Sequence, residues 1–206
     1  MPDLSNIKNI IFDLGNVVLN LDFDASIKAF QQLGLNEAEI SPSVAFSDPV
    51  FYLLETGRIT PAEFRTRVRE LLNNPNASDQ QIDDAWYAMI LDIPEKRVKA
   101  LQDLRSKYRI FLFSNTNEIH IGRLLEEFKA IYGFDFQGLF DEVFYSHELQ
   151  ARKPEIHAFQ KVIELTGVEP GETLFVDDLK NNILAAEKAG LQTLWLKAGM
   201  EMAELF

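Results

Sequence analysis

The sequence of 206 residues contains no cysteine, which excludes both disulfide bonds and thiolate chemistry. It also has no uncharged apolar run that approaches the roughly 18 residues of a membrane-spanning helix. The first five residues, Met-Pro-Asp-Leu-Ser, lack the basic and apolar regions of a signal peptide. We therefore expect a cytoplasmic protein that does not bind membranes.

Basic residues are scarce, because 20 lysines and arginines stand against 32 aspartates and glutamates, for a formal net charge of −12. A field of this sign repels nucleic acid and anionic lipid, so neither is expected as a partner. It also repels phosphorylated ligands. A site for such a ligand would therefore need local cations and a bound metal ion.

Apolar residues, in contrast, are plentiful. They make up 47% of the chain, charged residues make up 25%, and 16 phenylalanines are available for a core. These fractions are typical of a folded globular protein. The length fits one domain of ordinary size, or a core domain with a modest insertion.

Five short apolar runs predict buried parallel strands, because they are nearly continuous instead of alternating. They lie at residues 9–12, 110–113, 142–145, 173–176 and 193–196. Helical patterns at 118–131, 154–165 and 179–189 separate the later runs. This alternation predicts an α/β fold with a doubly wound, Rossmann-like parallel sheet of five core strands.

Residues 22–100 interrupt the alternation with a segment that reads as almost wholly helical. Thr60-Pro61-Ala62-Glu63 is a capping box, and Ser78-Asp79 is a second helix start. The segment is too long for a connection between a strand and a helix. We therefore predict a helical cap at 22–100, inserted into an α/β core made of residues 1–21 and 101–206.

Polar side chains follow the predicted strands in a telling order. Asp13 comes after the first strand, Ser114 and Asn115 after the second, and Asp177-Asp178 after the fourth, with Lys153 between them. Open α/β sheets bind ligands at the carboxyl ends of their strands. The order therefore indicates a site for a phosphate and a divalent metal ion.

An aspartate carboxylate can accept a phosphoryl group and pass it to water. Such a transfer needs a cation to offset charge, and Mg²⁺ suits carboxylate ligands. Asp13 is the expected nucleophile and a metal ligand, with Asp178 or Asp177 as a second carboxylate. Lys153 would neutralise charge, and Ser114 with nearby backbone N–H groups would bind phosphate oxygens, at the start of a helix.

These residues resemble the four motifs of haloacid dehalogenase superfamily hydrolases, in order and over the whole chain. The matching segments are Ile-Ile-Phe-Asp-Leu-Gly-Asn-Val at 10–17, Phe-Ser-Asn at 113–115, Lys-Pro-Glu at 153–155 and Val-Asp-Asp at 176–178. Family members with a helical insert after the first strand carry a bundle-like cap there, as expected here.

The resemblance implies that Asp13 is the nucleophile. It also implies a Mg²⁺ ion held by Asp13, the backbone carbonyl of Gly15 and Asp178. Asp177 and Asn182 would not bind the metal ion themselves but would form hydrogen bonds next to its ligands.

The resemblance further implies that Ser114, Asn115 and Lys153 contact the substrate phosphate. The residues of these motifs are similar to those of a branch of the family that includes bacterial α-glucose-1-phosphate phosphatases. This similarity implies a Mg²⁺-dependent phosphatase of a small phosphorylated metabolite, expected to be a sugar phosphate. We expect the chain to be a monomer or weak homodimer.

Gly15 departs from the pattern of most phosphatases of the family, which carry an aspartate there as general acid and base. Losing such a group costs a factor of about 10²–10⁴ in rate. Asp22 and Asp24 are the nearby substitutes. We therefore expect a slow phosphatase, a good leaving group or a substitute donor.

Two alternatives are weighed against the phosphatase. A 2-haloacid dehalogenase would use the same aspartate without a metal, which leaves Asp177-Asp178 without a purpose. A catalytically impaired binding protein would explain Gly15 but not the retained Asp13 and Lys153. The three histidines, His120, His147 and His157, have no metal-ligand spacing and are expected on the surface or on helix faces.

Overall fold

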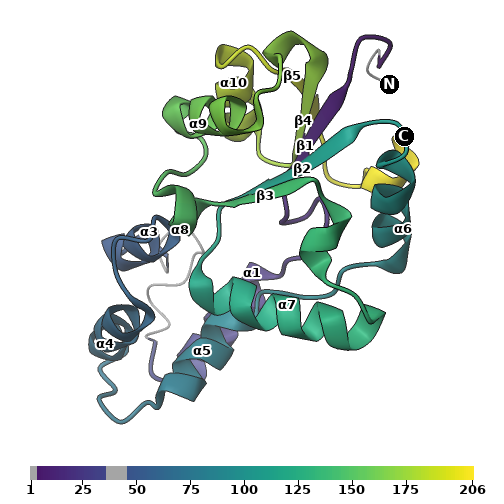
Figure 1. Ribbon diagram of the computed structural model, residues 1–206. Helices are drawn as coiled ribbons and strands as arrows, with labels where there is room; N and C mark the ends of the chain where they lie inside the picture. The colour runs from purple at the N-terminus through teal and green to yellow at the C-terminus, as the bar shows by residue number, and fades with distance from the viewer. Residues whose placement is uncertain (1–3, 36–45) are drawn as a thin grey trace.

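A computed structural model describes residues 4–35 and 46–206. Its centre is one parallel sheet with the strand order β3-β2-β1-β4-β5 (Figure 1). All five predicted strands are confirmed, with ends that differ by at most one residue. They are β1 (Asn9–Phe12), β2 (Arg109–Ser114), β3 (Glu142–Tyr145), β4 (Thr173–Asp177) and β5 (Gln192–Trp195).

The register brings the carboxyl ends of the three middle strands to one level. Phe12, the last residue of β1, pairs with Leu112 of β2 and with Val176 of β4. The backbone N–H of Asp13 continues this ladder and donates to the Val176 carbonyl at 2.9 Å. The residues that follow the three strands are therefore neighbours in space.

Helices cover both faces of the sheet, as a doubly wound fold requires. On one face, α6 (Glu95–Leu104) and α7 (Glu118–Tyr132) share a hydrophobic cluster with Ile10 and Phe12. On the other, α9 (Ile156–Thr166) and α10 (Lys180–Lys188) share a second cluster with Ile11 (Figure 1). Since neighbouring residues of β1 point to opposite faces, this strand is buried on both sides.

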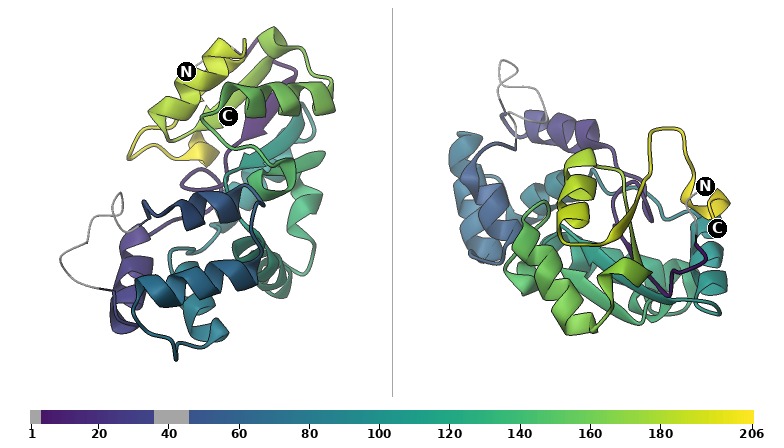
Figure 2. Two further views of the ribbon diagram at one scale, coloured as in Figure 1. Left: turned by 90° about the vertical axis from the view of Figure 1, so that its left-hand side faces the viewer. Right: turned by 90° about the horizontal axis from the view of Figure 1, so that it is seen from above.

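The predicted helical insert is present. Its helices are α1 (Phe23–Gln32), α3 (Pro49–Glu55), α4 (Pro61–Leu71) and α5 (Asp79–Tyr87). They enclose a third hydrophobic cluster of their own and lie together away from α9 and α10 (Figures 1 and 2). Both predicted helix starts are confirmed, since Thr60 and Ser78 each form a capping box.

The sequence analysis missed two short helices, α3 and α8 (Ser146–Leu149). The division into a core of 1–21 and 101–206 and a cap of 22–100 stays a proposal. α6 begins inside the proposed cap range, yet its Val98 and Leu101 pack in the cluster beneath the sheet. The two segments that connect the insert to the core run side by side, because Leu21 and Ile90 form an antiparallel bridge.

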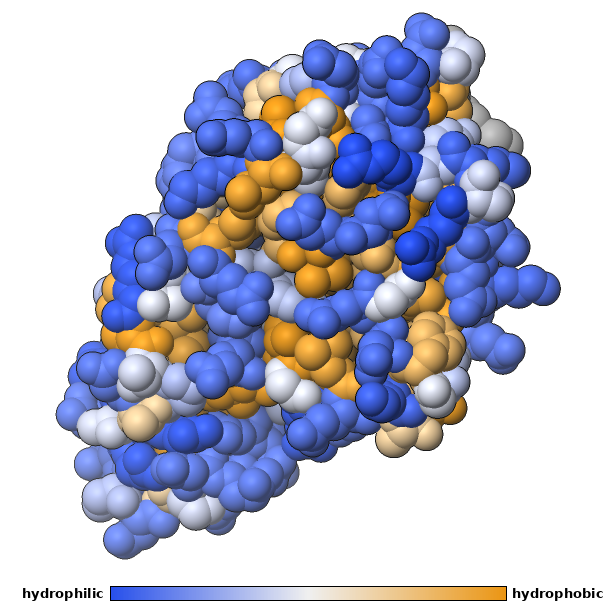
Figure 3. All heavy atoms as spheres, viewed as in Figure 1, coloured by the Kyte–Doolittle hydropathy of each residue, from blue (hydrophilic) through white to orange (hydrophobic). Residues whose placement is uncertain are grey.

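Three 3-10 helices complete the described elements: η2 (Phe136–Leu139), η3 (Pro170–Glu172) and η4 (Met202–Glu204). Hydrophilic residues cover most of the face shown in Figure 3, and hydrophobic residues appear in separate patches between them. Within residues 4–35 and 46–206, no helix has the length and apolar composition needed to cross a membrane.

Candidate active site

A buried lysine ties the strand-end carboxylates together. Lys153 Nζ lies 2.5 Å from Asp13 Oδ1 and 2.9 Å from Asp177 Oδ2, and it donates to the Phe113 carbonyl at 2.9 Å. Lys153 is only 1% exposed, so its charge depends on these partners. Burial opposes the charge, but Asp13 and Asp177 outweigh it and raise the Lys153 pKa.

Asp177 is fully buried at the end of β4, and both of its carboxylate oxygens accept hydrogen bonds. Besides Lys153, its carboxylate accepts from the Leu179 backbone N–H at 2.8 Å and from Asn182 Nδ2 at 3.0 and 3.1 Å. These bonds fix the lysine and the start of α10 together. The geometry agrees with the predicted supporting role of Asp177 and Asn182, which stays a proposal.

Asp178 is oriented by a residue that the sequence analysis did not single out. Asn16 Nδ2 donates to Asp178 Oδ2 at 3.0 Å, and Asn16 Oδ1 accepts from the Leu21 N–H at 3.2 Å. The backbone of Asn16 is left-handed, with φ of 54°. Asparagine tolerates this region better than most residues, and that preference is the signal by which Asn16 could have been found.

Trp195, at the end of β5, also supports Asp178. Its indole N–H donates to the Asp178 carbonyl at 2.9 Å. No sequence motif marked this tryptophan, because it lies 17 residues downstream on a different strand. Side chains from β5 and from the loop after β1 therefore hold the same aspartate from two sides.

The charges of this cluster favour a divalent cation. Carboxylate oxygens of Asp13, Asp177 and Asp178 lie within 4.8 Å of one another. Against these three carboxylates stands one ammonium, that of Lys153, which leaves two negative charges uncompensated. Burial is the main cause that raises the pKa of Asp13 to about 7; Lys153 opposes the rise, and Asp177 adds to it.

The donors present fit Mg²⁺, which prefers carboxylate and carbonyl oxygens. Asp13, Asp178 and the Gly15 carbonyl would hold the ion under the sequence prediction, and this ligand set stays a proposal. Burial raises the pKa of Asp178 as well. A nearby cation reverses such shifts, because it favours the ionised carboxylates.

The predicted phosphate-binding residues are found together at the end of β2. Ser114 is its last residue, and Asn115 exchanges two hydrogen bonds with the Lys153 backbone, at 2.8 and 2.9 Å. Asn115 thus holds in place the loop at 150–155 between α8 and α9, which we call the lysine loop. The helix that follows begins at Glu118, as the pattern at 118–131 predicts, and Asn117 caps it. Contacts of these side chains with phosphate stay a proposal.

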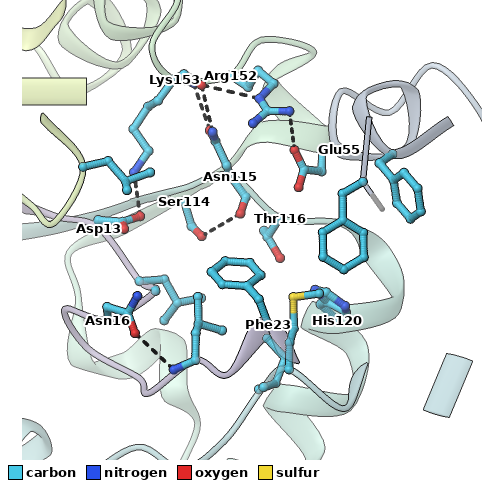
Figure 4. A pocket seen from close by; sticks show the side chains of 18 of the residues that line it. Asp13, Asn16, Phe23, Glu55, Ser114, Asn115, Thr116, His120, Arg152 and Lys153 are labelled. Atoms are coloured by element: carbon cyan, nitrogen blue, oxygen red, sulfur yellow. Dashed lines mark hydrogen bonds and ion pairs between the residues drawn. The ribbon is translucent and has the colours of Figure 1, made fainter. Parts of the chain in front are cut away.

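One cavity of about 380 Å³ joins these residues to the helical insert. Asp13, Asn16, Ser114, Asn115, Lys153 and Asp178 form its polar wall. Figure 4 shows Asp13 and Lys153 on one side of this cavity, with Phe23 and His120 on the other. Residues of the insert complete the wall: Phe23, Phe46, Asp48, Phe51, Tyr52, Glu55, Trp86, Met89 and Ile90.

Asp22 and Asp24, the two substitutes considered for the missing acid, do not line the cavity. Asp22 instead caps α1, where its carboxylate accepts from the Asp24 backbone N–H at 3.0 Å. Gly15 does line it, and a Cβ there would lie 2.6 Å from Leu21 Cδ1. The end of the Leu21 side chain would therefore have to move to admit a side chain at position 15.

His120 lies on a face of α7, one of the two places expected for the histidines, but that face is buried. This residue is 5% exposed and lines the cavity. Its ring stacks on Trp86 with 4.7 Å between the centroids. The sequence offered no periodic signal for this burial, since the partner belongs to α5 of the insert.

The doubly wound sheet and the strand-end aspartate, lysine and carboxylate cluster define a magnesium-dependent phosphatase of the α/β class. Comparison with known proteins supports this conclusion. The sequence profile of haloacid dehalogenase-like hydrolases matches residues 7–190, and the chain belongs to this family.

Among curated relatives, a D-ribitol-5-phosphate phosphatase of Bacteroides thetaiotaomicron is 29% identical over 195 residues, which cover 95% of this chain and 94% of the relative. A crystal structure of the HAD family enzyme BT-2542 from the same species, in complex with magnesium and inorganic phosphate, is 37% identical. Its TM-score is 0.88, with 97% of this chain and 99% of that chain covered.

A predicted HAD-like family hydrolase from Porphyromonas gingivalis is 32% identical, with a TM-score of 0.85 and coverage of 95% and 94%. An L-2-haloacid dehalogenase from Xanthobacter autotrophicus has a TM-score of 0.63 at 18% identity, with coverage of 96% and 80%. That likeness extends to the fold alone.

Proposed function

We propose that this chain hydrolyses the monophosphate ester of a small sugar or polyol, and that the phosphoryl group passes through an aspartyl phosphate on Asp13. The observation that carries the proposal is the Lys153 ammonium held 2.5 Å from Asp13, inside a cluster of three carboxylates. The similarity to a D-ribitol-5-phosphate phosphatase supports the substrate class.

The reaction has two steps. A carboxylate oxygen of Asp13 forms a bond to phosphorus as the bond from phosphorus to the alcohol oxygen breaks, and the alcohol takes up a proton. Water then attacks phosphorus, which restores the carboxylate and releases inorganic phosphate. Lys153 keeps Asp13 oriented and offsets the charge of the incoming phosphate.

A bound magnesium ion supplies further neutralisation of charge on the transferring group. The chain itself supplies the enclosure, since the insert covers the cavity and limits the access of bulk water. Because Gly15 has no side chain, we expect slow turnover or a preference for good leaving groups.

The proposal is tested by release of phosphate from an aryl phosphate and from D-ribitol 5-phosphate, with Mg²⁺ or with a chelator. We expect activity with Mg²⁺, and its loss with the chelator or in Asp13→Asn. Asp22→Asn is the matched control, since it changes a carboxylate that caps α1 outside the cavity and asparagine caps equally well. Equal activity in Asp13→Asn and Asp22→Asn would disprove the assignment of the nucleophile.

The two alternatives predict other outcomes. A dehalogenase would release chloride from 2-chloropropionate without a metal, but the uncompensated carboxylates around Asp13 favour a metal-dependent reaction. An impaired binding protein would release no phosphate from any ester. Beryllofluoride with Mg²⁺ should raise the melting temperature of the protein if the aspartyl-phosphate site is intact. An unchanged melting temperature would favour the impaired binding protein.

A further inference from the structure

The half of the cavity formed by the helical insert carries four aromatic side chains, Phe23, Phe46, Phe51 and Trp86. Its polar side chains Asp48, Tyr52 and Glu55 are already paired, with Arg67, Glu155 and Arg152 respectively. A leaving group that enters this half loses its water against aromatic rings, which form few hydrogen bonds. The position of any polar group there therefore decides which leaving groups are accepted.

His120 is such a group. Its Nε2 lies 3.1 Å from the Trp86 carbonyl oxygen, which can only accept a hydrogen bond. Nε2 must therefore carry the proton, and in the neutral ring Nδ1 is then an acceptor. Stacking on Trp86 and the hydrogen bond of Asn117 to the His120 backbone N–H fix the orientation of the ring.

The ring is also kept neutral. Burial lowers the pKa of His120 to about 4, and the Trp86 carbonyl only partly opposes this effect. Nδ1 has no hydrogen-bond partner recorded among residues 4–35 and 46–206, and the His120 ring lines the cavity.

The cations of the described lining offer nothing to a second anionic group. Lys153 is paired with Asp13 and Asp177, and Arg152 is paired with Glu55 at 2.6 Å (Figure 4). A carboxylate or second phosphate on the leaving group would meet an acceptor in His120 and no unpaired cation. The cavity thus disfavours a charged leaving group.

We propose that His120 determines specificity, by accepting at Nδ1 a hydrogen bond from a hydroxyl group of an uncharged leaving group. The inference rests on the proposed phosphatase function and narrows its substrate class. The preferred ester has a carbon skeleton with a hydroxyl remote from the phosphate. His120 does not take part in the transfer of the phosphoryl group.

The test compares two esters with the same number of carbons, D-ribitol 5-phosphate and n-pentyl phosphate, in the full chain with Mg²⁺. His120→Phe keeps an aromatic ring but removes both nitrogens. We expect this variant to raise KM for the ribitol ester roughly 10-fold, as loss of one buried hydrogen bond does. KM for the pentyl ester should stay within about 2-fold, and kcat for both should be retained.

His120→Gln keeps a donor for Trp86 and an acceptor, so it should recover part of the lost preference and serves if the phenylalanine variant does not fold. Equal changes for both esters would overturn the inference, as would a wild-type enzyme that prefers pentyl phosphate. If wild-type protein hydrolyses neither these esters nor an aryl phosphate, the proposed function itself fails. Retained aryl phosphatase activity without a ribitol preference refutes only the role of His120.

Discussion

At the scale of single residues, the charged residues of the site were easier to predict than the side chains that orient them. Asp13 and Asp178 were predicted because each follows a buried strand, and Lys153 because it precedes a helix in the order typical of the family. Asn16 and Trp195 were missed, although both hold Asp178 in place. Their roles come from neighbours across the sheet, which no spacing in the sequence reveals.

Gly15 offers a test at the same scale. A Cβ at this position would lie 2.6 Å from Leu21 Cδ1. We predict that Gly15→Ala lowers the free energy of unfolding by about 1 kcal/mol, because the end of the flexible Leu21 side chain must move aside. Urea unfolding of wild type, Gly15→Ala, Leu21→Ala and the double variant measures the effect.

The contact predicts coupling between the two sites. In a Leu21→Ala background the added methyl group has space. The double variant should therefore lose about 1 kcal/mol less stability than the sum of the losses in the two single variants. Strictly additive changes would show that Leu21 does not restrict position 15.

At the scale of elements, α3 of the insert lies against α8 and the loop that precedes α9. Tyr52 donates to Glu155 at 2.9 Å, and Glu55 pairs with Arg152. Burial raises the pKa of Glu55, although Arg152 opposes this. A helix that the sequence analysis missed therefore makes the main polar contacts between the insert and the lysine loop.

Gly57 marks the closest approach in this contact, because a Cβ there would lie 2.1 Å from the His147 carbonyl oxygen. We predict that Gly57→Ala displaces the insert, lowers stability and raises KM for the phosphate ester several-fold. Gly167→Ala is the matched control. Both glycines follow a helix with φ of 63°, but nothing lies within 4 Å of a Cβ at Gly167.

The left-handed backbone alone costs an alanine about 1–2 kcal/mol, so both variants should lose this much. Gly57→Ala should lose about 1–3 kcal/mol more, through the clash with the carbonyl. Thermal unfolding and steady-state kinetics separate the two effects. Identical behaviour of the two variants would argue against a tight contact between the insert and α8.

At the scale of the whole molecule, an ion pair joins distant parts of the chain. Arg97 of α6 donates to both oxygens of Glu201, near η4, at 2.9 and 3.3 Å. Burial opposes ionisation of Glu201, but hydrogen bonds from Arg97 and Lys96 outweigh it and lower the pKa to about 2. The pair therefore helps to keep the carboxyl-terminal segment on the core.

This shift predicts how stability depends on pH. The ordinary pKa of Glu201 is 4.5, so the unfolded chain binds a proton there at higher pH than the folded chain does. The stabilisation is complete above about pH 4.5 and is lost as the pH falls toward 2. We predict that Glu201→Gln costs about 1–2 kcal/mol at pH 7.

Urea unfolding of both proteins between pH 7 and pH 2.5 measures this difference, which should shrink as the pH falls below 4.5. A difference that is constant over this range would mean that the Glu201 carboxylate contributes through packing and not through its charge. The same titration in Lys96→Ala reports how much of the shift belongs to the second cation.

The sequence by itself determined the α/β class, the five strands, the helical insert and the strand-end residues of the site. Apolar runs and helix caps depend on residues that are close together in the sequence, so strands and helix starts can be predicted from the sequence alone. Only the tertiary structure decided that Lys153 meets Asp13 across 140 residues of chain, and that His120 is buried beneath Trp86. Such contacts depend on the packing of separate elements, and so does the cavity that those elements enclose.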